Sequence, residues 1–416
     1  MTPQSVIRST LLPSGLRVVT ERMPDVRSVT AGFWVGTGSR DEDASISGAS
    51  HFLEHLLFKG TASRSAREIA EAVDAVGGDL NAFTTKEYTA FYVRVLSDAL
   101  EMGLDILCDI ITAPAFRPDE VEAERQVILE EILLREDEPA DLVHEVLGDA
   151  LFPDHPLGRE VLGLESTVKA MEVDAIRDFF AHHYRPGNMV FGAAGDLDHD
   201  QVVAGLGQRL GEAAGGRSPA RSAPSLPARP VAVVRRQTEQ AHVAIGVPAP
   251  DRHAPERWAL SVLNHTLGGG LSSRLFQEIR ERRGLAYSVY SYRTAHDDAG
   301  AMVVYAGTGP ERAAEVVELV GVEMDRLAQG GLTPRELAVA RGHLRGDLAL
   351  SLEDSAARMS RIGRSQLLHG EVLSVEEIAA RIESVTLEQV GEVAARVLGA
   401  PRTLAVVGPF DKSDFS

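Results

Sequence analysis

The chain has 416 residues, of which 44% are hydrophobic and 25% charged; these are ordinary globular values and exclude wholesale disorder. Its 42 basic and 61 acidic residues give a formal net charge of -19, which argues against a nucleic-acid partner because phosphates would be repelled. The single cysteine, Cys108, excludes an internal disulfide, and neither a long apolar run nor an export signal is evident. We therefore expect a cytoplasmic protein of two or more domains with no membrane partner.

Two segments with the alternation of paired strands, residues 15–22 and 28–35, precede the stretch S-H-F-L-E-H-L-L-F-K-G at residues 50–60. In a helix, His51 and His55 lie on one face about a turn apart, where both imidazoles can hold one metal ion. The carboxylate of Glu54 reaches the same face and is available as a base for a metal-bound water. The order H-x-x-E-H is the inverzincin motif of metallopeptidases.

A structural role for this histidine pair is the simpler alternative, because such pairs also occur as polar stripes on amphipathic helices. The body of the predicted helix is, however, unusually apolar; Ser47 or Ser50 can cap its start and Gly60 can end it. A helix of this composition is expected to be buried, and buried imidazoles and carboxylates need partners. A metal ion supplies those partners.

Helices and strands alternate in the segment that follows. The periodicity predicts helices over residues 65–76, 96–111 and 118–135, and a strand pair over residues 79–85 and 87–96. Four other histidines in the first half have no partner at metal-ligand spacing and are interpreted as structural or surface residues. They are His144, His155, His182 and His183.

The helix predicted over residues 118–135 is rich in glutamate. Two of these glutamates, Glu124 and Glu131, are seven residues apart and lie along the apolar stripe of the helix, whereas Glu130 points elsewhere. An exposed acidic face explains the other glutamates well and these two poorly. If the histidine pair needs a third protein ligand, this helix is its best source in the first half.

The two halves of the chain resemble each other on either side of a Pro-, Ser-, Gly- and Ala-rich segment. Residues 241–248 take the place of residues 28–35, and residues 332–347 that of residues 116–131, so that Ala340 and Asp347 replace the two glutamates. The simplest account is a duplicated α+β unit, in which each copy is a mostly antiparallel sheet packed with helices and only the first copy carries the metal set. Chance similarity of amphipathic helices is the alternative. The predicted division is a metal-binding peptidase domain at 1–212, a linker at 213–230 and a peptidase-like domain lacking the metal ligands at 231–416.

Five stretches in order resemble the pitrilysin and mitochondrial processing peptidase family of zinc metallopeptidases, most closely its short bacterial members. They are H-F-L-E-H at 51–55, G-G-D-L-N-A-F-T at 77–84, E-R-Q-V-I-L-E-E at 124–131, Y-R-P-G-N-M-V at 184–190 and R-E-R-R-G-L-A-Y-S-V at 280–289. The resemblance extends over nearly the whole chain.

This resemblance implies a zinc endopeptidase in which His51, His55 and Glu131 bind one Zn²⁺ per chain and Glu124 orients the site. Glu54 is then the general base that activates the metal-bound water for attack on the scissile carbonyl.

The resemblance assigns further residues to the substrate. Arg280 and Tyr287 match a family pair near the substrate, with Tyr287 donating to the developing oxyanion; without the resemblance we would interpret them as a surface arginine and a packed tyrosine. The strand residues Leu80, Asn81, Ala82 and Phe83 match the edge strand to which an extended peptide is added.

An extended or unfolded peptide is therefore the expected substrate. In the family, two two-domain halves close around the substrate, so this chain, which supplies one half, is expected to form a homodimer. Arg280 and Tyr287 would then act in the same subunit or in the partner. Two alternatives remain at this point: a non-catalytic binding or assembly subunit on the same fold, and a metallohydrolase of small molecules.

Overall fold

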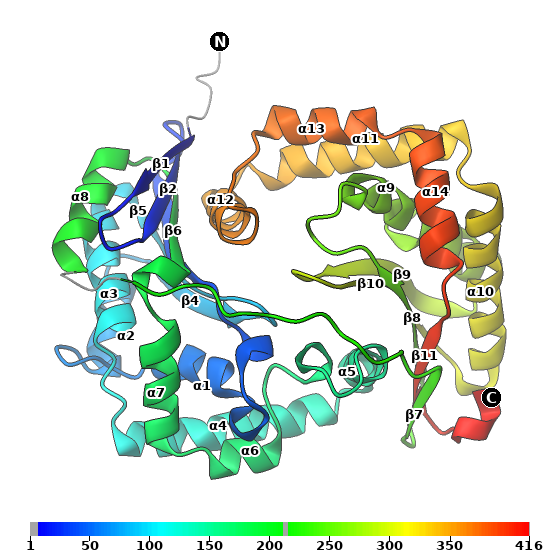
Figure 1. The fold of residues 1–416 in the computed structure, drawn as a ribbon, viewed down its shortest axis with the longest axis horizontal. Helices are drawn as coiled ribbons and strands as arrows, with labels where there is room; N and C mark the ends of the chain where they lie inside the picture. The colour runs from blue at the N-terminus through cyan, green and yellow to red at the C-terminus, as the bar shows by residue number, and fades with distance from the viewer. Residues whose placement is uncertain (1–6, 211–214, 416) are drawn as a thin grey trace. The chain divides into compact units, whose positions relative to one another are not determined.

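The computed structural model describes residues 7–210 and 215–415, and Figure 1 shows their course. The chain divides into two compact units, each assembled from three segments. The first unit comprises Met1–Ile132, Glu160–Ala220 and Leu350–Leu373, and the second comprises Leu133–Arg159, Arg221–Ala349 and Ser374–Ser416. Among the described residues, no helix is long and apolar enough to cross a membrane.

A six-stranded sheet in the order β1-β2-β6-β3-β5-β4 is the centre of the first unit. The pair β2 and β6 is parallel, and every other neighbouring pair is antiparallel. The strands are β1 (Ile7–Leu11), β2 (Arg17–Arg22), β3 (Ser28–Val35), β4 (Asp79–Thr84), β5 (Thr89–Leu96) and β6 (Met189–Gly195). The predicted mixture of strands and helices is thus confirmed, and β4 forms a free edge.

Both faces of this sheet are covered, which explains why the central strand β3 is buried almost throughout. One face packs on the main core of the unit, to which β3 contributes Val29, Ala31 and Phe33. The opposite face, with Trp34, packs on α12 (Ser355–His369). This helix comes from the C-terminal part of the chain and is drawn in orange in Figure 1.

The docking of α12 combines close packing with buried charge. Gly363 lies so near Trp34 that an added Cβ would be 2.2 Å from the indole nitrogen, which excludes a larger residue there. Beside this contact Glu21 is fully buried and forms ion pairs with Arg358 and Arg361, the latter at 3.0 Å. Removing either side of such a pair leaves an uncompensated buried charge.

The sheet of the second unit has five strands in the order β7-β11-β8-β10-β9. The strands are β7 (Val231–Arg235), β8 (Ala241–Ala249), β9 (Ala286–Ala295), β10 (Gly300–Thr308) and β11 (Thr403–Gly408). Here β7 and β11 are parallel and the other pairs antiparallel. Taken in chain order, the five strands have the same arrangement as β2 to β6, so the two units share one topology.

Each unit covers one face of its sheet with a helix from the other half of the sequence. The helix α5 (Pro139–Leu151) packs on the sheet of the second unit, as α12 packs on that of the first. Glu124 and Ala340 correspond at an offset of 340 − 124 = 216 positions, and the starts of α5 and α12 have the same offset, 355 − 139 = 216. The two helices are therefore equivalent and exchanged. The predicted division at 213–230 does not include this exchange, because sequence order alone does not reveal which sheet a helix covers.

The remaining helices complete the two units. In the first they are α1 (Ala49–Leu56), α2 (Ala66–Asp74), α3 (Leu100–Thr112), α4 (Pro118–Glu136), α6 (Glu165–Ala170), α7 (Val173–His183) and α8 (His199–Arg209), with the last residues of α4 assigned to the second unit. In the second they are α9 (Arg257–Gly268), α10 (Ala313–Gly330), α11 (Pro334–Ser351), α13 (Val375–Ser384) and α14 (Leu387–Leu398), with the last residues of α11 assigned to the first unit.

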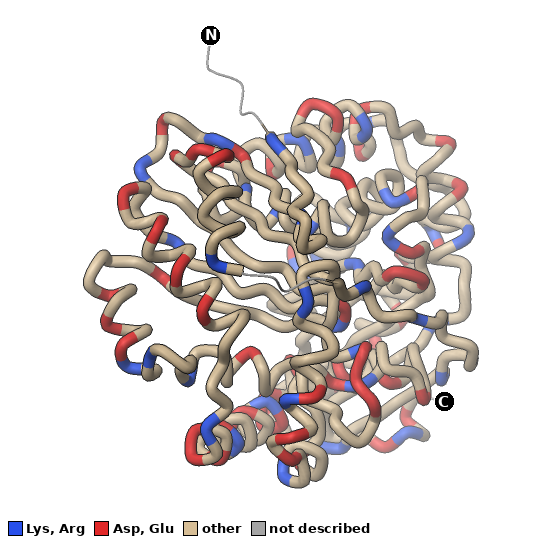
Figure 2. The backbone as a smooth tube through the Cα atoms, turned by 60° about the vertical axis from the view of Figure 1, so that its left-hand side comes forward, with Lys and Arg blue, Asp and Glu red and all other residues tan. Residues whose placement is uncertain are grey.

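One helix boundary differs from the sequence-based expectations, while the predicted linker is irregular where it is described. The helix expected from residue 96 begins at Leu100, because Leu96 still belongs to β5 and Ser97–Ala99 forms a 3-10 turn. Of the segment predicted as a linker, residues 215–230 form neither helix nor strand, while residues 211–214 lie outside the described part. Figure 2 shows acidic and basic positions interspersed along the chain rather than gathered in one block.

Candidate metal centre

The helix α1 carries the H-x-x-E-H motif, and its start is fixed by a buried carboxylate. The backbone N–H groups of Gly48 and Ser50 each donate a hydrogen bond of 2.7 Å to Glu42, which is 4% exposed. The predicted caps, Ser47 and Ser50, do not cap the helix with their side chains; Gly48 is the N-cap residue and has a positive φ of 100°. A carboxylate at this position satisfies free N–H groups and interacts favourably with the helix dipole.

Three side chains converge beside this helix. The Nε2 atoms of His51 and His55 each lie 3.6 Å from Oε2 of Glu131 on α4. Ligands at roughly 2.0–2.1 Å from a tetrahedral Zn²⁺ lie about 3.3–3.4 Å apart, so the observed spacing suits a single ion. Potential ligand atoms of these three residues all lie within 4.8 Å of one another. Among the described residues, no other group of three or more His, Cys, Asp or Glu side chains could hold a metal ion in this way. The sequence assignment of Glu131, rather than Glu130, agrees with this geometry.

The three side chains of the trio range from buried to partly exposed. The side chain of His51 is 7% exposed, that of His55 21% and that of Glu131 42%. Catalytic zinc sites hold the ion with three protein ligands and structural sites with four, so a group of three candidate ligands matches the catalytic pattern.

A second glutamate on α4 orients one of the imidazoles. The Nδ1 atom of His55 lies 3.0 Å from Oε2 of Glu124, whose side chain is 6% exposed. An N–H donated from Nδ1 to a carboxylate leaves the lone pair of Nε2 free to face a metal. The other carboxylate oxygen of Glu124 accepts a hydrogen bond of 2.6 Å from the ammonium of Lys59.

Glu54 lies on the same helix, beside Thr84, the last residue of the edge strand β4. The Thr84 hydroxyl donates to the carbonyl of Ser50 on the same helix at 3.5 Å. Burial raises the pKa of Glu54 above its ordinary value, and the nearby Glu131 adds to this, while Thr84 and the neighbouring His55 oppose it. A raised pKa makes this carboxylate a stronger base than an exposed glutamate.

The predicted substrate strand is the free edge of the first sheet. Its residues Leu80 to Phe83 pair with β5 on one side only. The backbone N–H of Ala82 donates to the side chain of Asn81 at 2.8 Å, so it points away from β5 toward the free edge. An extended peptide could pair with such groups.

Arg280 and Tyr287 belong to the second unit and contact each other there. The guanidinium of Arg280, on a π-helical turn at Phe276–Arg282, lies 4.7 Å from the ring centroid of Tyr287 and 4.8 Å from that of Phe276. Tyr287 is on β9 and is 79% exposed. The earlier alternative of a packed tyrosine is therefore wrong, because the ring is open to solvent with the cation over its face.

Comparisons with known proteins identify the family to which the chain belongs. The family model described as Insulinase (Peptidase family M16) matches residues 17–165, and that described as Peptidase M16 inactive domain matches residues 170–344. A protein of Streptomyces coelicolor is 48% identical over 412 residues, which cover 97% of this chain and 90% of that protein. One of Bacillus subtilis is 38% identical over 397 residues, covering 95% and 97%. The chain belongs to peptidase family M16, the insulinase family.

Both relatives carry the name of an uncharacterized zinc protease. Solved structures agree on the fold of this M16 family member. A peptidase M16 inactive domain from Pseudomonas fluorescens has a TM-score of 0.91 at 22% identity, covering 98% of each chain. A protease from Helicobacter pylori has a TM-score of 0.89 at 22% identity, covering 97% of this chain and 100% of that one. The predicted family and the two-domain α+β architecture are confirmed.

Three residues of the site were not identified from the sequence. Glu42, Lys59 and Thr84 act through contacts between segments that no periodicity links. Thr84 and Lys59 do lie inside stretches already singled out, at the end of D-L-N-A-F-T and of H-L-L-F-K-G. Their position in those stretches is the sequence feature that could have marked them as site residues.

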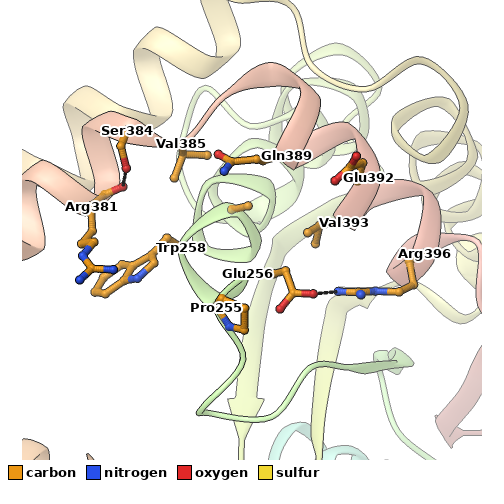
Figure 3. A pocket seen from close by; sticks show the side chains of 11 residues that line it. Pro255, Glu256, Trp258, Arg381, Ser384, Val385, Gln389, Glu392, Val393 and Arg396 are labelled. Carbon is orange, nitrogen blue, oxygen red and sulfur yellow. Dashed lines mark hydrogen bonds and ion pairs between the residues drawn. The ribbon is translucent and has the colours of Figure 1, made fainter.

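Two other features of this M16 family member do not add to the metal centre. A cavity of about 450 Å³ lies in the second unit between α9, α13 and α14; Figure 3 shows Trp258 beside it and the ion pair of Glu256 with Arg396 at 3.0 Å. It is lined by none of the predicted site residues. Burial raises the pKa of Cys108 to about 12, so its thiol is not a competent nucleophile at neutral pH.

Proposed function

We propose that this protein is a zinc-dependent endopeptidase that cleaves extended or unfolded peptides. The observation that carries the proposal is the convergence of His51, His55 and Glu131 on one point, with Glu54 on the same helix and not needed as a ligand. Two neutral imidazoles and one carboxylate are a common donor set for catalytic zinc. The zinc protease names of the relatives support the choice of metal.

The residues of the chain divide the work as follows. The chemistry that bound Zn²⁺ supplies is that of a Lewis acid, which lowers the pKa of water and polarises a carbonyl oxygen. Glu54 takes the proton from the attacking water and returns it to the leaving amine nitrogen. Glu124 keeps His55 in the tautomer that faces the ion.

The substrate would be positioned by the edge strand. Main-chain pairing to Leu80–Phe83 uses atoms that every residue shares, so it binds extended peptides with little sequence preference. Because β4 ends at Thr84, which contacts Glu54, a peptide added to this strand would be led toward the base. Tyr287 is proposed to donate to the oxyanion, with Arg280 beside it.

The deciding experiment compares the zinc-loaded wild type with Glu54→Gln on a mixed library of unstructured peptides roughly 10 to 30 residues long. Glutamine keeps the shape of the side chain but cannot accept the proton, so we expect cleavage to fall by about 100-fold or more. Bound zinc, measured by elemental analysis, should be unchanged. Cut sites identified by mass spectrometry would then begin to define specificity.

If the wild type binds zinc and cuts no peptide of any length, the endopeptidase proposal fails for the lone chain. The second candidate, a non-catalytic binding or assembly subunit, would then be favoured, because the edge strand can bind peptides without cleaving them. Cleavage restricted to the shortest peptides would instead favour a small-molecule hydrolase. We also propose a homodimer in which Arg280 and Tyr287 act in the same or the partner subunit; the mass in solution, measured by light scattering, tests the dimer.

A further inference from the structure

Lys59 is connected to the metal centre through Glu124, which contacts both Lys59 and His55. It follows α1 in the chain, and its ammonium donates at 2.6 Å to Oε1 of Glu124. The other oxygen of that carboxylate is 3.0 Å from Nδ1 of His55. A single carboxylate thus joins a surface lysine to an imidazole whose second nitrogen faces Glu131.

The backbone around Lys59 is fixed by several contacts. Gly60 has a φ of 108°, and an added Cβ would lie 2.4 Å from the guanidinium of Arg117. Arg117 in turn donates to the carbonyl of Thr61 at 2.8 Å, and Ala115 donates to the carbonyl of Gly60 at 3.0 Å. The turn is therefore tied to the segment that begins α4, the helix of Glu124. The lysine does not depend on a mobile loop to reach its partner.

The burial of the two partners differs, which separates this pair from an ordinary surface ion pair. The side chain of Glu124 is 6% exposed and that of Lys59 34%. Both oxygens of the buried carboxylate are engaged, one by each partner, so the plane of the carboxylate is set by Lys59 and His55 together. Without the ammonium the carboxylate can turn about its last bond, and its directed contact with Nδ1 weakens.

We propose that Lys59 is a positioning residue for the metal: it holds the Glu124 carboxylate so that His55 presents Nε2 to the ion. The inference deepens the proposed function and rests on its metal site. It predicts whether removal of Lys59 raises or lowers the zinc affinity. A lysine that acted only by its charge would repel Zn²⁺, so its removal would raise zinc affinity. A lysine that positions Glu124 stabilises the bound ion, and its removal lowers the affinity.

The test is the zinc dissociation constant of Lys59→Met, measured by competition with a chromophoric chelator. Methionine keeps the length of the side chain without the charge or the donor. We expect the affinity to fall about tenfold, the lower end of the range for residues that support a metal ligand indirectly. Lys59→Arg should restore most of it, because the partly exposed side chain leaves room for a guanidinium to reach Glu124.

Two further measurements show whether Lys59 acts through Glu124. In a Glu124→Gln background, Lys59→Met should cause little additional loss, since the carboxylate that it holds is already gone. Lys169→Met is the matched control, because Lys169 pairs with Glu165 on an exposed helix of the same unit. It should leave zinc affinity unchanged.

An unchanged or increased zinc affinity of Lys59→Met, with Glu124→Gln impaired, would overturn the proposal. So would additive losses in the double variant. Thermal melts of the metal-free proteins identify any variant that is simply misfolded, and the arginine variant keeps the test decisive in that case. Because zinc affinity is measured without substrate, failure of the peptidase proposal for lack of cleavage would leave this result readable.

Discussion

At the scale of single residues, the metal centre depends on which face of a helix a side chain occupies. On α4, Glu131 faces the histidines and is part of the trio, whereas its neighbour Glu130 is exposed. Helical periodicity alone predicted that distinction, because a step of one residue turns a side chain by about 100°. The supporting residues could not be predicted in this way, since Glu42, Lys59 and Thr84 reach the site from loops and strand ends.

This pair of neighbours allows a controlled test of the third ligand. In Glu131→Gln, a neutral amide replaces the carboxylate that lies 3.6 Å from both imidazole nitrogens. We expect zinc affinity to fall about 100-fold or more, beyond the loss typical of residues that only support a ligand. The Glu130→Gln variant makes the same chemical change one residue away and should bind zinc like the wild type. Equal affinities of the two variants, measured by chelator competition, would remove Glu131 from the site.

At the scale of elements, hydrophobic periodicity predicts the strands and most helices, but it does not predict which elements pack against one another. The segment 28–35 was recognised as a strand, and β3 has those bounds. Its burial on both faces depends on α12, which is more than three hundred residues away in sequence. The hydrophobic periodicity of α12 does not specify which sheet the helix covers. That choice depends on close packing between particular side chains, such as the contact of Gly363 with Trp34.

The docking of α5 in the second unit contains titratable groups, which gives it a dependence on pH. His144 on α5 is 2.8 Å from the hydroxyl of Tyr292, and His242 on β8 is 2.8 Å from that of Tyr305. Burial lowers the pKa of His144, as does the neighbouring His242, while Asp141 opposes the shift. Burial likewise lowers the pKa of His242, opposed by Glu138.

The sign of the effect follows from these directions. The unfolded chain takes up protons on its histidines near pH 6.5, above the pKa values of the folded state, so stability is fully present above about pH 6.5 and is lost as the pH falls below it. We expect the urea midpoint to drop between about pH 7.5 and 5.5, and to drop less in His144→Gln. The control is His182→Gln, at an exposed position. An identical pH dependence in all three proteins would show that the α5 contact does not titrate.

At the scale of the whole molecule, duplication was evident from sequence order and the exchange of helices was not. The two sheets share one topology, and the helices at equivalent positions, α5 and α12, each cover the sheet of the other half. The segment at residues 215–230, which has the composition of a linker, is therefore a boundary in sequence without being a boundary between independent folding units. Each unit includes a helix from the other half of the sequence.

The exchange predicts the behaviour of the chain when it is divided between Ala220 and Arg221, the boundary of the two units there. Residues 1–220 lack α12, so the sheet face around Trp34 would be exposed to water, and they retain α5 without the sheet that it covers. Burial of such apolar faces is the main source of stability. We expect this fragment to bind a hydrophobic dye and to unfold without a sharp transition, and mixing with residues 221–416 to restore both dye exclusion and zinc binding.

A designed control separates loss of α12 from damage caused by the cut itself. Appending residues 350–373 to the fragment 1–220 through a flexible linker returns the helix that covers the first sheet. This longer fragment should unfold cooperatively and bind less dye than residues 1–220, because only the apolar face of α5 then remains uncovered. If the plain fragment 1–220 already unfolds cooperatively and binds no more dye than the longer one, α12 is not needed to complete the first unit, and the exchanged helices are a consequence of chain connectivity rather than a requirement of folding.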